Sequence, residues 1–332
     1  MTQLIGLKRG IARLDEYSLQ WEGLFEKEKE TLQSLLGDLK VDVYHIGSTS
    51  IPGMIAKPII DIAVVIDDLD ELNEYIKDLE EAGFIYRADH DTWEKRLFIK
   101  GGEDYRTHHI HFYRRDSSQL KHVLTFRDYL YYNQEPAEFY TKFKRLLAAR
   151  YPSDRLTYTE IKGEFIDRIL AIANFERERG ISIRRVKDSD FHGWLRMRYK
   201  LWAECPIEEH IKEINQWLSS PETPVYIAEC KQHGLVGFVE TSIHNTVRSS
   251  IGYIEGWYVE ETHRRIGIGK TLLIMAETWA LSMGFSEMGS DVKVENYRSI
   301  AAHKRLDYNE IDRDETEVKF LKALTSRNVS IL

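Results

Sequence analysis

The alternation of hydrophobic and polar positions predicts a chain that mixes helices and strands along its whole length. Within 158–175, Ile161, Phe165, Ile169 and Ile172 recur at helical spacing, whereas ISIRRV at 181–186 alternates with the period of a strand. The charged stretch ERERG between them ends in glycine, which is typical of a boundary. The pattern therefore predicts two domains, residues 1–178 and 179–332.

The same two periods predict the elements of each domain. In the first, they predict helices at 20–36, 49–55, 69–82, 117–132, 136–150 and 157–175, and strands at 41–46, 59–66, 84–87, 94–99 and 107–113. In the second, they predict helices at 188–202, 207–218, 267–283 and 296–305, and strands at 181–186, 224–230, 234–244, 251–259, 286–291, 307–312 and 317–323. We expect α+β and α/β domains, each with a sheet and covering helices.

The amino-acid composition and net charge limit the kinds of molecule that the protein is expected to bind. The 332 residues are 42% hydrophobic and 30% charged, which is typical of a globular protein. The net charge is −8 and neither half has an excess of Lys and Arg, so we expect no nucleic-acid partner. No apolar run approaches the roughly 18 residues of a membrane helix and no signal-peptide pattern opens the chain, which favours a cytoplasmic protein without a membrane partner. Cys205 and Cys230 are far apart in sequence and lack CxxC spacing, which argues against a disulfide framework or a cysteine zinc site. Reducing conditions put a bond between the two at about one in ten.

The stretch HRRIGIGKTLL at 263–273 matches the end of an ATP-binding P-loop, but the full motif fails. A P-loop needs glycine where Arg264 stands, and the dinucleotide fingerprint needs glycine where Leu272 stands. The remaining R-x-x-G-x-G lies between a predicted strand and a predicted helix, where free N–H groups favour an anion. We interpret it as a metal-free pyrophosphate cradle, the alternative being a tight turn with exposed basic residues; its members are Arg264, Arg265, Gly267, Gly269 and Lys270.

Several blocks share an order with this cradle: WLRMRYKLW at 194–202, GFVETSI at 237–243, IEGWYV at 254–259, EMGSD at 287–291 and ENYRSIAAH at 295–303. Together they resemble the GNAT acyltransferases, and more narrowly the aminoglycoside 6'-N-acetyltransferases. The resemblance covers about 181–320. It implies a GNAT fold, acetyl-CoA as cofactor and a small-molecule amine as acceptor.

The resemblance also implies roles for single residues. Glu255 falls at the acidic position that binds or deprotonates the amine, and Asp291 at a second one that acts as base or cation clamp. A solvent-facing carboxylate and a turn cap are their respective alternatives. The N–H groups of Trp257 and Val259 would pair with the pantetheine arm and polarise the thioester. Asn296 would contact the cofactor arm or simply cap its helix.

Three further positions keep open roles. His303 stands where many GNATs have a tyrosine acid, and it could protonate the leaving thiolate, bind CoA or pack without function. Tyr199 and Trp202, one turn apart, could wall the substrate cleft or belong to the core. In RLDY at 305–308, Asp307 replaces a family glycine, which is tolerable if the turn needs no positive φ.

In the first domain, HIGSTSIPGMIAKPIIDIAVVI at 45–66 places a small-residue turn and a strand carboxylate together, which suits a phosphate and Mg²⁺. With RTHHIHF at 106–112, FRDYL at 126–130 and YTEIKGEFI at 158–166, it resembles the GrpB family over about 10–175. That family has a nucleotidyltransferase-like fold, which implies a mixed sheet with helices.

The sequence of this domain supplies few of the residues that phosphoryl transfer requires. Two-metal phosphoryl transfer needs a second carboxylate where Ala63 stands, while His109 and His111 share one strand face as a metal or phosphate site or as exposed polar residues. We expect a phosphate or metal site, with Mg²⁺ and a nucleotide as its ligands, formed by Gly47, Ser48, Asp61, His109 and His111.

The main functional hypothesis is acetyl transfer from acetyl-CoA to the 6'-amine of an aminoglycoside. Alternatives are another cellular amine such as a polyamine or amino sugar, and a bifunctional protein with an N-terminal nucleotidyltransferase. A third alternative is that the N-terminal half is only a binding or stabilising module. A homodimer is one assembly consistent with the sequence.

Overall fold

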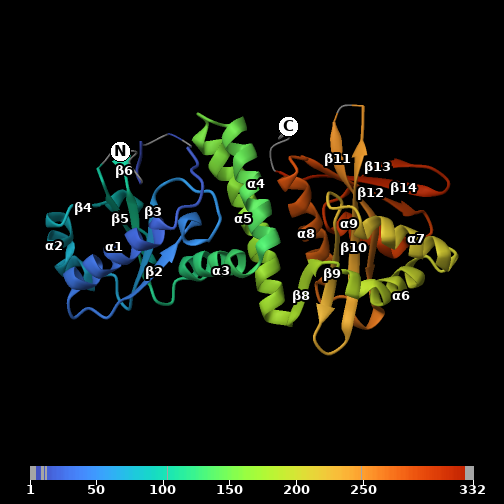
Figure 1. The fold of residues 1–332 in the computed structure, drawn as a ribbon, viewed down its shortest axis with the longest axis horizontal. Coiled ribbons are helices and arrows are strands. Elements are labelled where there is room, and N and C mark those ends of the chain that lie inside the picture. The colour runs from blue at the N-terminus through green and yellow to red at the C-terminus, as the bar shows by residue number, and fades with distance from the viewer. Residues whose placement is uncertain (1–4, 9–10, 12, 103, 248, 326–332) are drawn as a thin grey trace. The chain divides into compact units, whose positions relative to one another are not determined.

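A computed structural model describes residues 5–8, 11, 13–102, 104–247 and 249–325 (Figure 1). The chain forms two compact units, Met1–Lys162 and Gly163–Leu332, each of which has its own sheet. Helix α5 (Arg155–Arg179) begins in the first unit and ends in the second, just before Gly180 at φ 63°. The predicted boundary at 178/179 lies at the C-terminal end of this helix.

The first unit is built on a five-stranded mixed sheet. Its order is β2 (Asp42–Ile46), β3 (Ile60–Ile66), β7 (His108–Arg114), β5 (Lys95–Lys100) and β4 (Phe84–Tyr86). Strands β3 and β7 are parallel, and the other neighbours are antiparallel. The nearly continuous apolar run of β3 fits a central strand covered on both faces.

Helices cover both faces of this sheet. Helix α1 (Gln20–Leu36) buries Trp21, Phe25 and Leu32 against the face of Ile62 and Val64. The alternate residues Ala63 and Val65 pack with α3 (Ser118–Tyr132) on the opposite face. Helix α4 (Gln134–Arg150) then packs against α3.

Two predicted helices of this unit are wrong or shortened. The segment 49–55 forms only a 3₁₀ turn, Ser48–Ser50, because Pro52 and the left-handed Gly53 follow, and its apolar residues are buried without regular structure. The predicted helix 69–82 divides into a 3₁₀ turn, Glu71–Glu74, and the short α2 (Ile76–Glu81). The paired strands β1 (Leu7–Lys8) and β6 (Tyr105–Arg106) were not predicted, since two residues are too short for a periodic signal.

The second unit is built on a seven-stranded sheet. Its order is β13 (Asn309–Arg313), β14 (Glu317–Ala323), β12 (Glu287–Lys293), β11 (Ser250–Val259), β10 (Gly234–Asn245), β9 (Val225–Cys230) and β8 (Ile181–Arg185). All neighbours are antiparallel except β11 and β12. This parallel pair matches only Gly252–Ile254 with Met288–Ser290, so the strands separate before β11 ends.

Helices flank this sheet too. Helix α6 (Phe191–Leu201) packs Trp194 against Phe238, and α7 (Ile207–Leu218) packs beside α6. The neighbouring strand residue, Gly237, meets Ile268 and Leu272 of α8 (Ile268–Ser282), so α8 covers the opposite face. Helix α9 (Tyr297–Arg305) follows β12. These elements lie within a few residues of their predicted bounds.

The turn after α9 corrects one expectation. Asp307 has φ 66°, so the turn does adopt the left-handed conformation that the family glycine would supply. Aspartate tolerates this conformation better than most side chains. The predicted strand at 307–312 starts only at Asn309 as a result.

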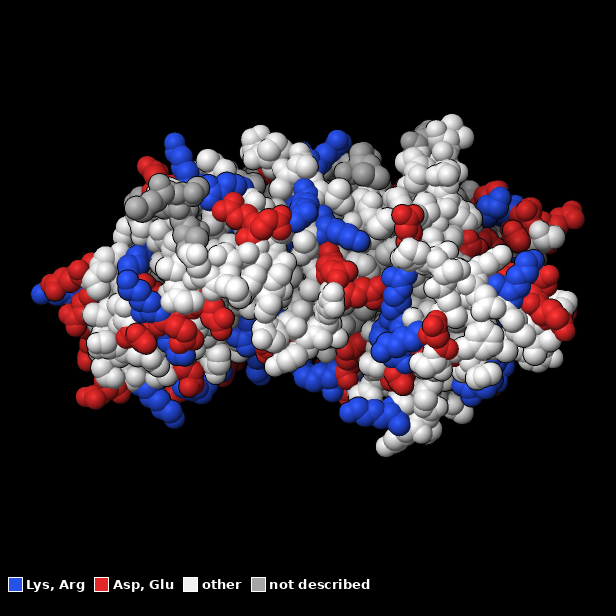
Figure 2. Space-filling model, in the orientation of Figure 1, with Lys and Arg blue, Asp and Glu red and all other residues white. Residues whose placement is uncertain are grey.

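Two surface observations complete the description. Within the described residues, no helix combines the length and the apolar character needed to cross a bilayer. On the face in Figure 2, basic and acidic side chains are interspersed over each unit.

Candidate active site

The central feature of the site is a β-bulge in β11. Glu240 pairs with Gly256 and Thr241 pairs with Ile254, so Glu255 is an extra residue with no partner on β10. A bulge bends its strand and redirects the inserted side chain. Glu255 is accordingly exposed between the buried residues Ile254 and Gly256.

Glu255 belongs to a connected group of polar side chains. Its Oε1 accepts hydrogen bonds from Ser242 Oγ at 2.5 Å and from His244 Nε2 at 2.7 Å. The His244 ring stacks on Tyr253 with 3.8 Å between centroids, and Tyr253 donates to Asp291 Oδ1 at 2.9 Å. Burial and the neighbouring Asp291 raise the pKa of Tyr253, which keeps its proton in place. Both predicted carboxylates thus lie at the ends of one group.

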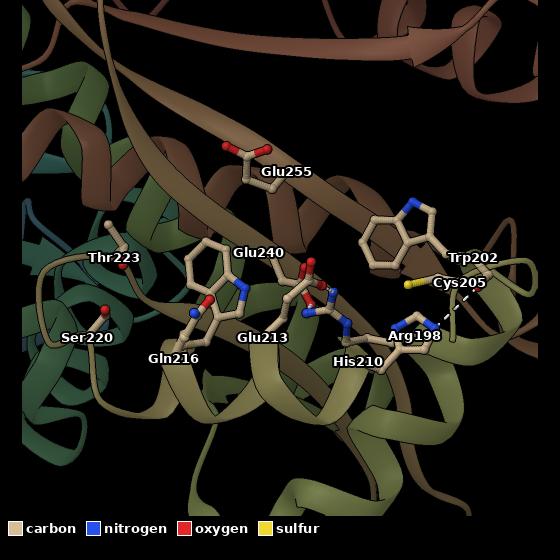
Figure 3. A pocket seen from close by; sticks show the side chains of 11 residues that line it. Arg198, Trp202, Cys205, His210, Glu213, Gln216, Ser220, Thr223, Glu240 and Glu255 are labelled. Atoms are coloured by element: carbon tan, nitrogen blue, oxygen red, sulfur yellow. Dashed lines mark hydrogen bonds and ion pairs between the residues drawn. The ribbon is translucent and has the colours of Figure 1, made fainter. Parts of the chain in front are cut away.

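A pocket of about 530 Å³ opens beside Glu255 (Figure 3). The bend in β11 brings Gly256 so close to Trp202 that a Cβ on the glycine would lie 2.5 Å from the indole ring. Trp202 therefore lines the pocket and also packs on the core around Phe238, whereas Tyr199 is half-exposed and lies outside the lining. The lining also includes Arg198, His210, Glu213, Trp217 and Glu240.

Glu240, on the floor of this pocket, was not predicted. Burial raises its pKa to about 7, although Arg198 and a hydrogen bond from Trp194 oppose the rise. Arg198 Nη1 lies 3.1 Å from Glu240 Oε1, and its Nη2 donates to Glu213. With Glu255, the pocket therefore contains three carboxyl groups and one buried guanidinium.

A second pocket, of about 480 Å³, contains all the residues predicted for the cofactor: Trp257, Val259, Arg264, Arg265, Gly267, Gly269, Lys270 and Asn296. The backbone of β11 explains two of them. Glu260 N–H bonds to Val236 O, and alternation then directs Tyr258 toward β10. Trp257 and Val259 must direct their N–H and C=O groups to the other side, into the space where β12 has separated.

The cradle sits at the start of α8. The helix begins after Gly267 at φ 103° without a side-chain cap, so the N–H groups of its first turn face outward. A Cβ on Gly269 would lie 2.8 Å from the Trp257 ring, so glycine permits the helix start to approach the strand. Thr271 Oγ1 donates to Gly267 O at 3.1 Å, which occupies the hydroxyl that a P-loop would offer to magnesium.

Arg264 does not extend into the pocket as an unpaired cation. Its Nε donates to Val259 O at 2.8 Å and its Nη1 to Glu261 Oε1 at 3.2 Å. It therefore holds the loop against the end of β11. Arg265, at φ 66°, and Lys270 are exposed beside it and supply positive charge to the pocket.

Asn296, the N-cap of α9, and His303, within α9, have different surroundings. Asn296 accepts a hydrogen bond from Ser299 N at 3.1 Å, so it caps the helix while also lining the pocket. His303 is buried and stacks on Phe320, with Nδ1 2.9 Å from Ser299 O and Nε2 3.1 Å from Ser290 Oγ. Burial lowers the pKa of His303, and the ring lies outside the lining of the pocket. This placement favours packing among the three roles left open.

In the first unit, the predicted residues also lie together. His109 Nδ1 is 2.9 Å from Asp61 Oδ1, and donor atoms of Asp61, His109 and His111 lie within 4.8 Å of one another. A Cβ on Gly47 would lie 2.5 Å from Asp61 Oδ2. Burial would raise the pKa of Asp61, but the hydrogen bond and charge of His109 hold it below its usual value.

Two features of that group bear on the expected Mg²⁺ and nucleotide. The position for a second carboxylate, Ala63, is buried, and Mg²⁺ prefers oxygen ligands to imidazoles. Ser48 Oγ accepts a hydrogen bond at 3.0 Å from Lys144, a buried residue that was not predicted. These side chains therefore lend no support to Mg²⁺ or a nucleotide.

The first unit matches proteins with no activity in their names. The family described as GrpB protein matches residues 12–171. The glutamate-rich protein GrpB of Alkalihalophilus pseudofirmus is 33% identical over 50% of this chain and 98% of its own length. UPF0157 protein YqkA of Bacillus subtilis is 35% identical over 45% of this chain, which spans only 43% of that relative.

The second unit matches acetyltransferases. The family described as Acetyltransferase (GNAT) family matches residues 189–308. Aminoglycoside N(6')-acetyltransferase type 1 of Klebsiella aerogenes is 34% identical over 39% of this chain and 90% of its own length. The solved structure of AAC(6')-Iy with the bisubstrate analogue CoA-S-monomethyl-acetylneamine is 27% identical over 40% of this chain and 94% of that one, with a TM-score of 0.38.

The fold and the comparisons define the class of the second unit as an acetyl-CoA-dependent N-acetyltransferase. The chain belongs to the GrpB family through its N-terminal half and to the GNAT family through its C-terminal half. The two resemblances and the two-domain fold class expected from the sequence are confirmed.

Proposed function

We propose that the C-terminal half transfers the acetyl group of acetyl-CoA to a primary amine of a polycationic acceptor, the 6'-amine of an aminoglycoside. The observation that carries this proposal is the position of Glu255. The bulge presents its carboxylate at the pocket of about 530 Å³ beside Trp202, which we call the acceptor pocket. Glu255 stands two residues before Trp257, whose backbone faces the pocket of about 480 Å³, the cofactor pocket. On β11, a single residue, Gly256, thus lies between the proposed base and the backbone that faces the cofactor pocket.

The chemistry needs a nucleophilic amine and a polarised thioester. Glu255 accepts the proton that the amine loses, directly or through a water, while Ser242 and His244 hold its carboxylate in place. The amine nitrogen then forms the new C–N bond at the thioester carbon. The N–H groups on the open side of β11 stabilise the negative oxygen of the tetrahedral intermediate. Breaking the C–S bond leaves its electron pair on the CoA thiolate.

The acceptor pocket favours a polycation. Glu213, Glu240 and Glu255 contribute carboxyl groups, and Trp202 and Trp217 contribute flat apolar surface. Carboxylates provide charge complementarity to protonated amines, and indole faces attract ammonium groups and sugar rings. The names of the similar acetyltransferases, which specify the N(6') position of aminoglycosides, point to the same acceptor class.

The purified protein can be tested by following CoA release with a thiol reagent. We expect release with acetyl-CoA and kanamycin, and much slower release with spermidine. The absence of release with any aminoglycoside would overturn the acceptor, and release with spermidine alone would transfer the proposal to polyamines.

Replacement of the proposed base gives a sharper prediction. Glu255→Gln keeps the shape of the side chain but removes its basicity, so kcat should fall more than tenfold. Glu315→Gln changes an exposed carboxylate in the turn between β13 and β14 and should leave kcat unchanged. Near-normal turnover by Glu255→Gln would rule out the assigned role.

A further inference from the structure

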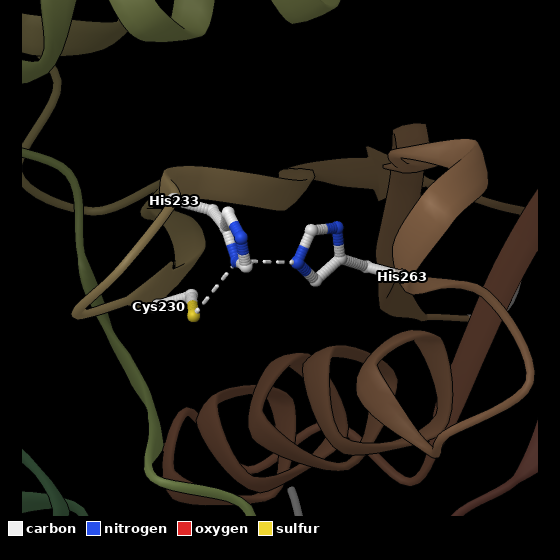
Figure 4. A group of neighbouring side chains, drawn as sticks. All are labelled: Cys230, His233 and His263. Carbon is white, nitrogen blue, oxygen red and sulfur yellow. Dashed lines mark hydrogen bonds between the residues drawn. The ribbon is translucent and has the colours of Figure 1, made fainter.

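Three metal-ligating side chains meet on the second unit, outside the acceptor pocket (Figure 4). Cys230 ends β9, His233 lies in the turn before β10, and His263 ends the short 3₁₀ helix Glu261–His263 that precedes Arg264. The end of β9 with its turn, and a 3₁₀ helix 30 residues further along the chain, therefore bring a thiol and two imidazoles to one place. We propose that Cys230, His233 and His263 form a binding site for Zn²⁺.

The distances fit a tetrahedral ion. Cys230 Sγ lies 3.5 Å from His233 Nδ1, and His263 Nε2 lies 3.1 Å from the same nitrogen. Zn²⁺ binds sulfur at about 2.3 Å and imidazole nitrogen at about 2.0–2.1 Å, so tetrahedral angles place S and N about 3.5 Å apart and two nitrogens about 3.3 Å apart. The two separations from His233 Nδ1 are close to these values, and all three donor atoms lie within 4.8 Å of one another.

Hydrogen bonding alone accounts poorly for this convergence. His233 Nδ1 carries at most one proton, yet both the Cys230 sulfur and His263 Nε2 lie within bonding distance of it. A metal ion placed among the three would use one lone pair from each residue and would release the proton of the Cys230 thiol. The arrangement thus fits a shared cation better than a shared proton.

A neighbouring hydroxyl group supports the same assignment. Thr262 Oγ1 lies 2.9 Å from His263 Nδ1, and the ring nitrogen that does not bind a metal usually has such a partner. If Nδ1 donates to the hydroxyl, Nε2 presents its lone pair to the other two ligands. The ligand set of one thiolate and two imidazoles selects zinc over magnesium or calcium.

The surface position leaves room for a fourth ligand. His233 is exposed, and Cys230 and His263 are half-buried, so water can complete the coordination. His263 also lines the cofactor pocket. An ion here would connect the β9–β10 turn to His263, the residue that immediately precedes the cradle.

Cobalt spectroscopy of the full-length protein tests the site. Co²⁺ should give a sulfur-to-cobalt charge-transfer band that Zn²⁺ abolishes, with one equivalent bound. Cys230→Ser should abolish the band, and His233→Ala and His263→Ala should abolish it or weaken binding more than tenfold. Cys205→Ser and His192→Ala, which change the other cysteine and an exposed histidine, should keep it.

The outcomes separate the possibilities. No band in the wild-type protein, or a band that survives Cys230→Ser, overturns the proposal. A metal held by Asp61, His109 and His111 would bind without a sulfur band, so it cannot imitate the result. A measurement on wild-type protein guards against unfolded variants: Zn²⁺ should protect Cys230, but not Cys205, from alkylation, and equal labelling of the two would contradict the site.

Discussion

Glu240 and Glu255 line the same pocket, yet their surroundings give them different properties. Glu255 is exposed at a bulge and accepts hydrogen bonds from Ser242 and His244. Glu240 is buried on the floor of the pocket beside Arg198. Burial raises the pKa of Glu240 to about 7, because it penalises the charged form of the carboxyl group. The pocket floor should therefore change its charge near neutral pH.

This titration predicts a pH-dependent affinity for the acceptor. Above pH 7 the ionised Glu240 attracts a cationic substrate, and below it the neutral carboxyl does not. The KM for a kanamycin-like acceptor should therefore fall as pH rises through about 7, and Glu240→Gln should flatten this dependence. Steady-state kinetics between pH 6 and 8 measure it; an unchanged slope in the variant would assign the titration to another group.

The same group makes a prediction for stability. A carboxyl whose pKa is raised in the folded state contributes most stability below its unfolded pKa of 4.5 and loses that contribution as pH rises through about 7. Between pH 5 and 8, wild type should therefore lose up to about 3 kcal/mol of unfolding free energy relative to Glu240→Gln. Urea unfolding at both pH values measures the difference, and a change of opposite sign would contradict the assigned pKa shift.

The sequence could identify some of these residues but not all. Glu255 and Asp291 lie in blocks that carry the resemblance to acetyltransferases. His244 and Tyr253 have no motif, because their contact depends on how β10 and β11 pair beyond the bulge. Glu240 sits in GFVETSI, but its burial and its partner Arg198 come from the packing of α6 on the sheet.

At the scale of elements, the junction of β11 and α8 controls the cofactor pocket. Gly269 is the second residue of α8, and the Trp257 ring occupies the space beside its Cα. The Trp257 ring is bulky and also packs edge-on against His303, so it cannot move aside as readily as the end of a flexible side chain. The absence of a side chain at Gly269 therefore allows the cradle to pack closely against β11.

A methyl group at this contact should weaken cofactor binding. Gly269→Ala would place Cβ 2.8 Å from the Trp257 ring and force the helix start away from β11, so KM for acetyl-CoA should rise about tenfold or more. Gly23→Ala, in α1, adds the same methyl where nothing lies within 4 Å and should leave KM unchanged. Equal KM values for the two variants would show that the close approach is dispensable.

Periodicity predicted most elements and failed where local chemistry interrupts it. The helix of 20–36 and the strands of the second unit have long, regular patterns, and the structure has them within a few residues. The segment 49–55 is equally apolar, but its residues are buried by tertiary packing around Pro52. The left-handed Asp307 could not be predicted from its residue type, because only the turn geometry requires a positive φ.

At the scale of the whole molecule, two families share one chain, and each unit has its own hydrophobic core. Two resemblances in the sequence were sufficient to predict this organisation. They could not predict that α5 belongs to both units, because a continuous helical pattern contains no information about which core receives each turn.

Separate cores predict that cofactor binding stabilises one unit selectively. Acetyl-CoA at 100 times its Kd should add about 2.7 kcal/mol to the unfolding free energy of the unit that binds it. Hydrogen exchange by mass spectrometry should therefore slow in the strands of Gly163–Leu332 and stay unchanged in β3 and β7. Equal protection of both sheets would indicate that the two units unfold together.

The early separation of β11 from β12 has one more consequence. A sheet that opens in its interior leaves backbone groups of Trp257 and Val259 facing a space that no other strand fills. The pantetheine arm of acetyl-CoA, bound in that space, would take the place of the missing strand pairing along β11. The ligand would then stabilise the sheet at the point where it opens, and not only at its outer edges.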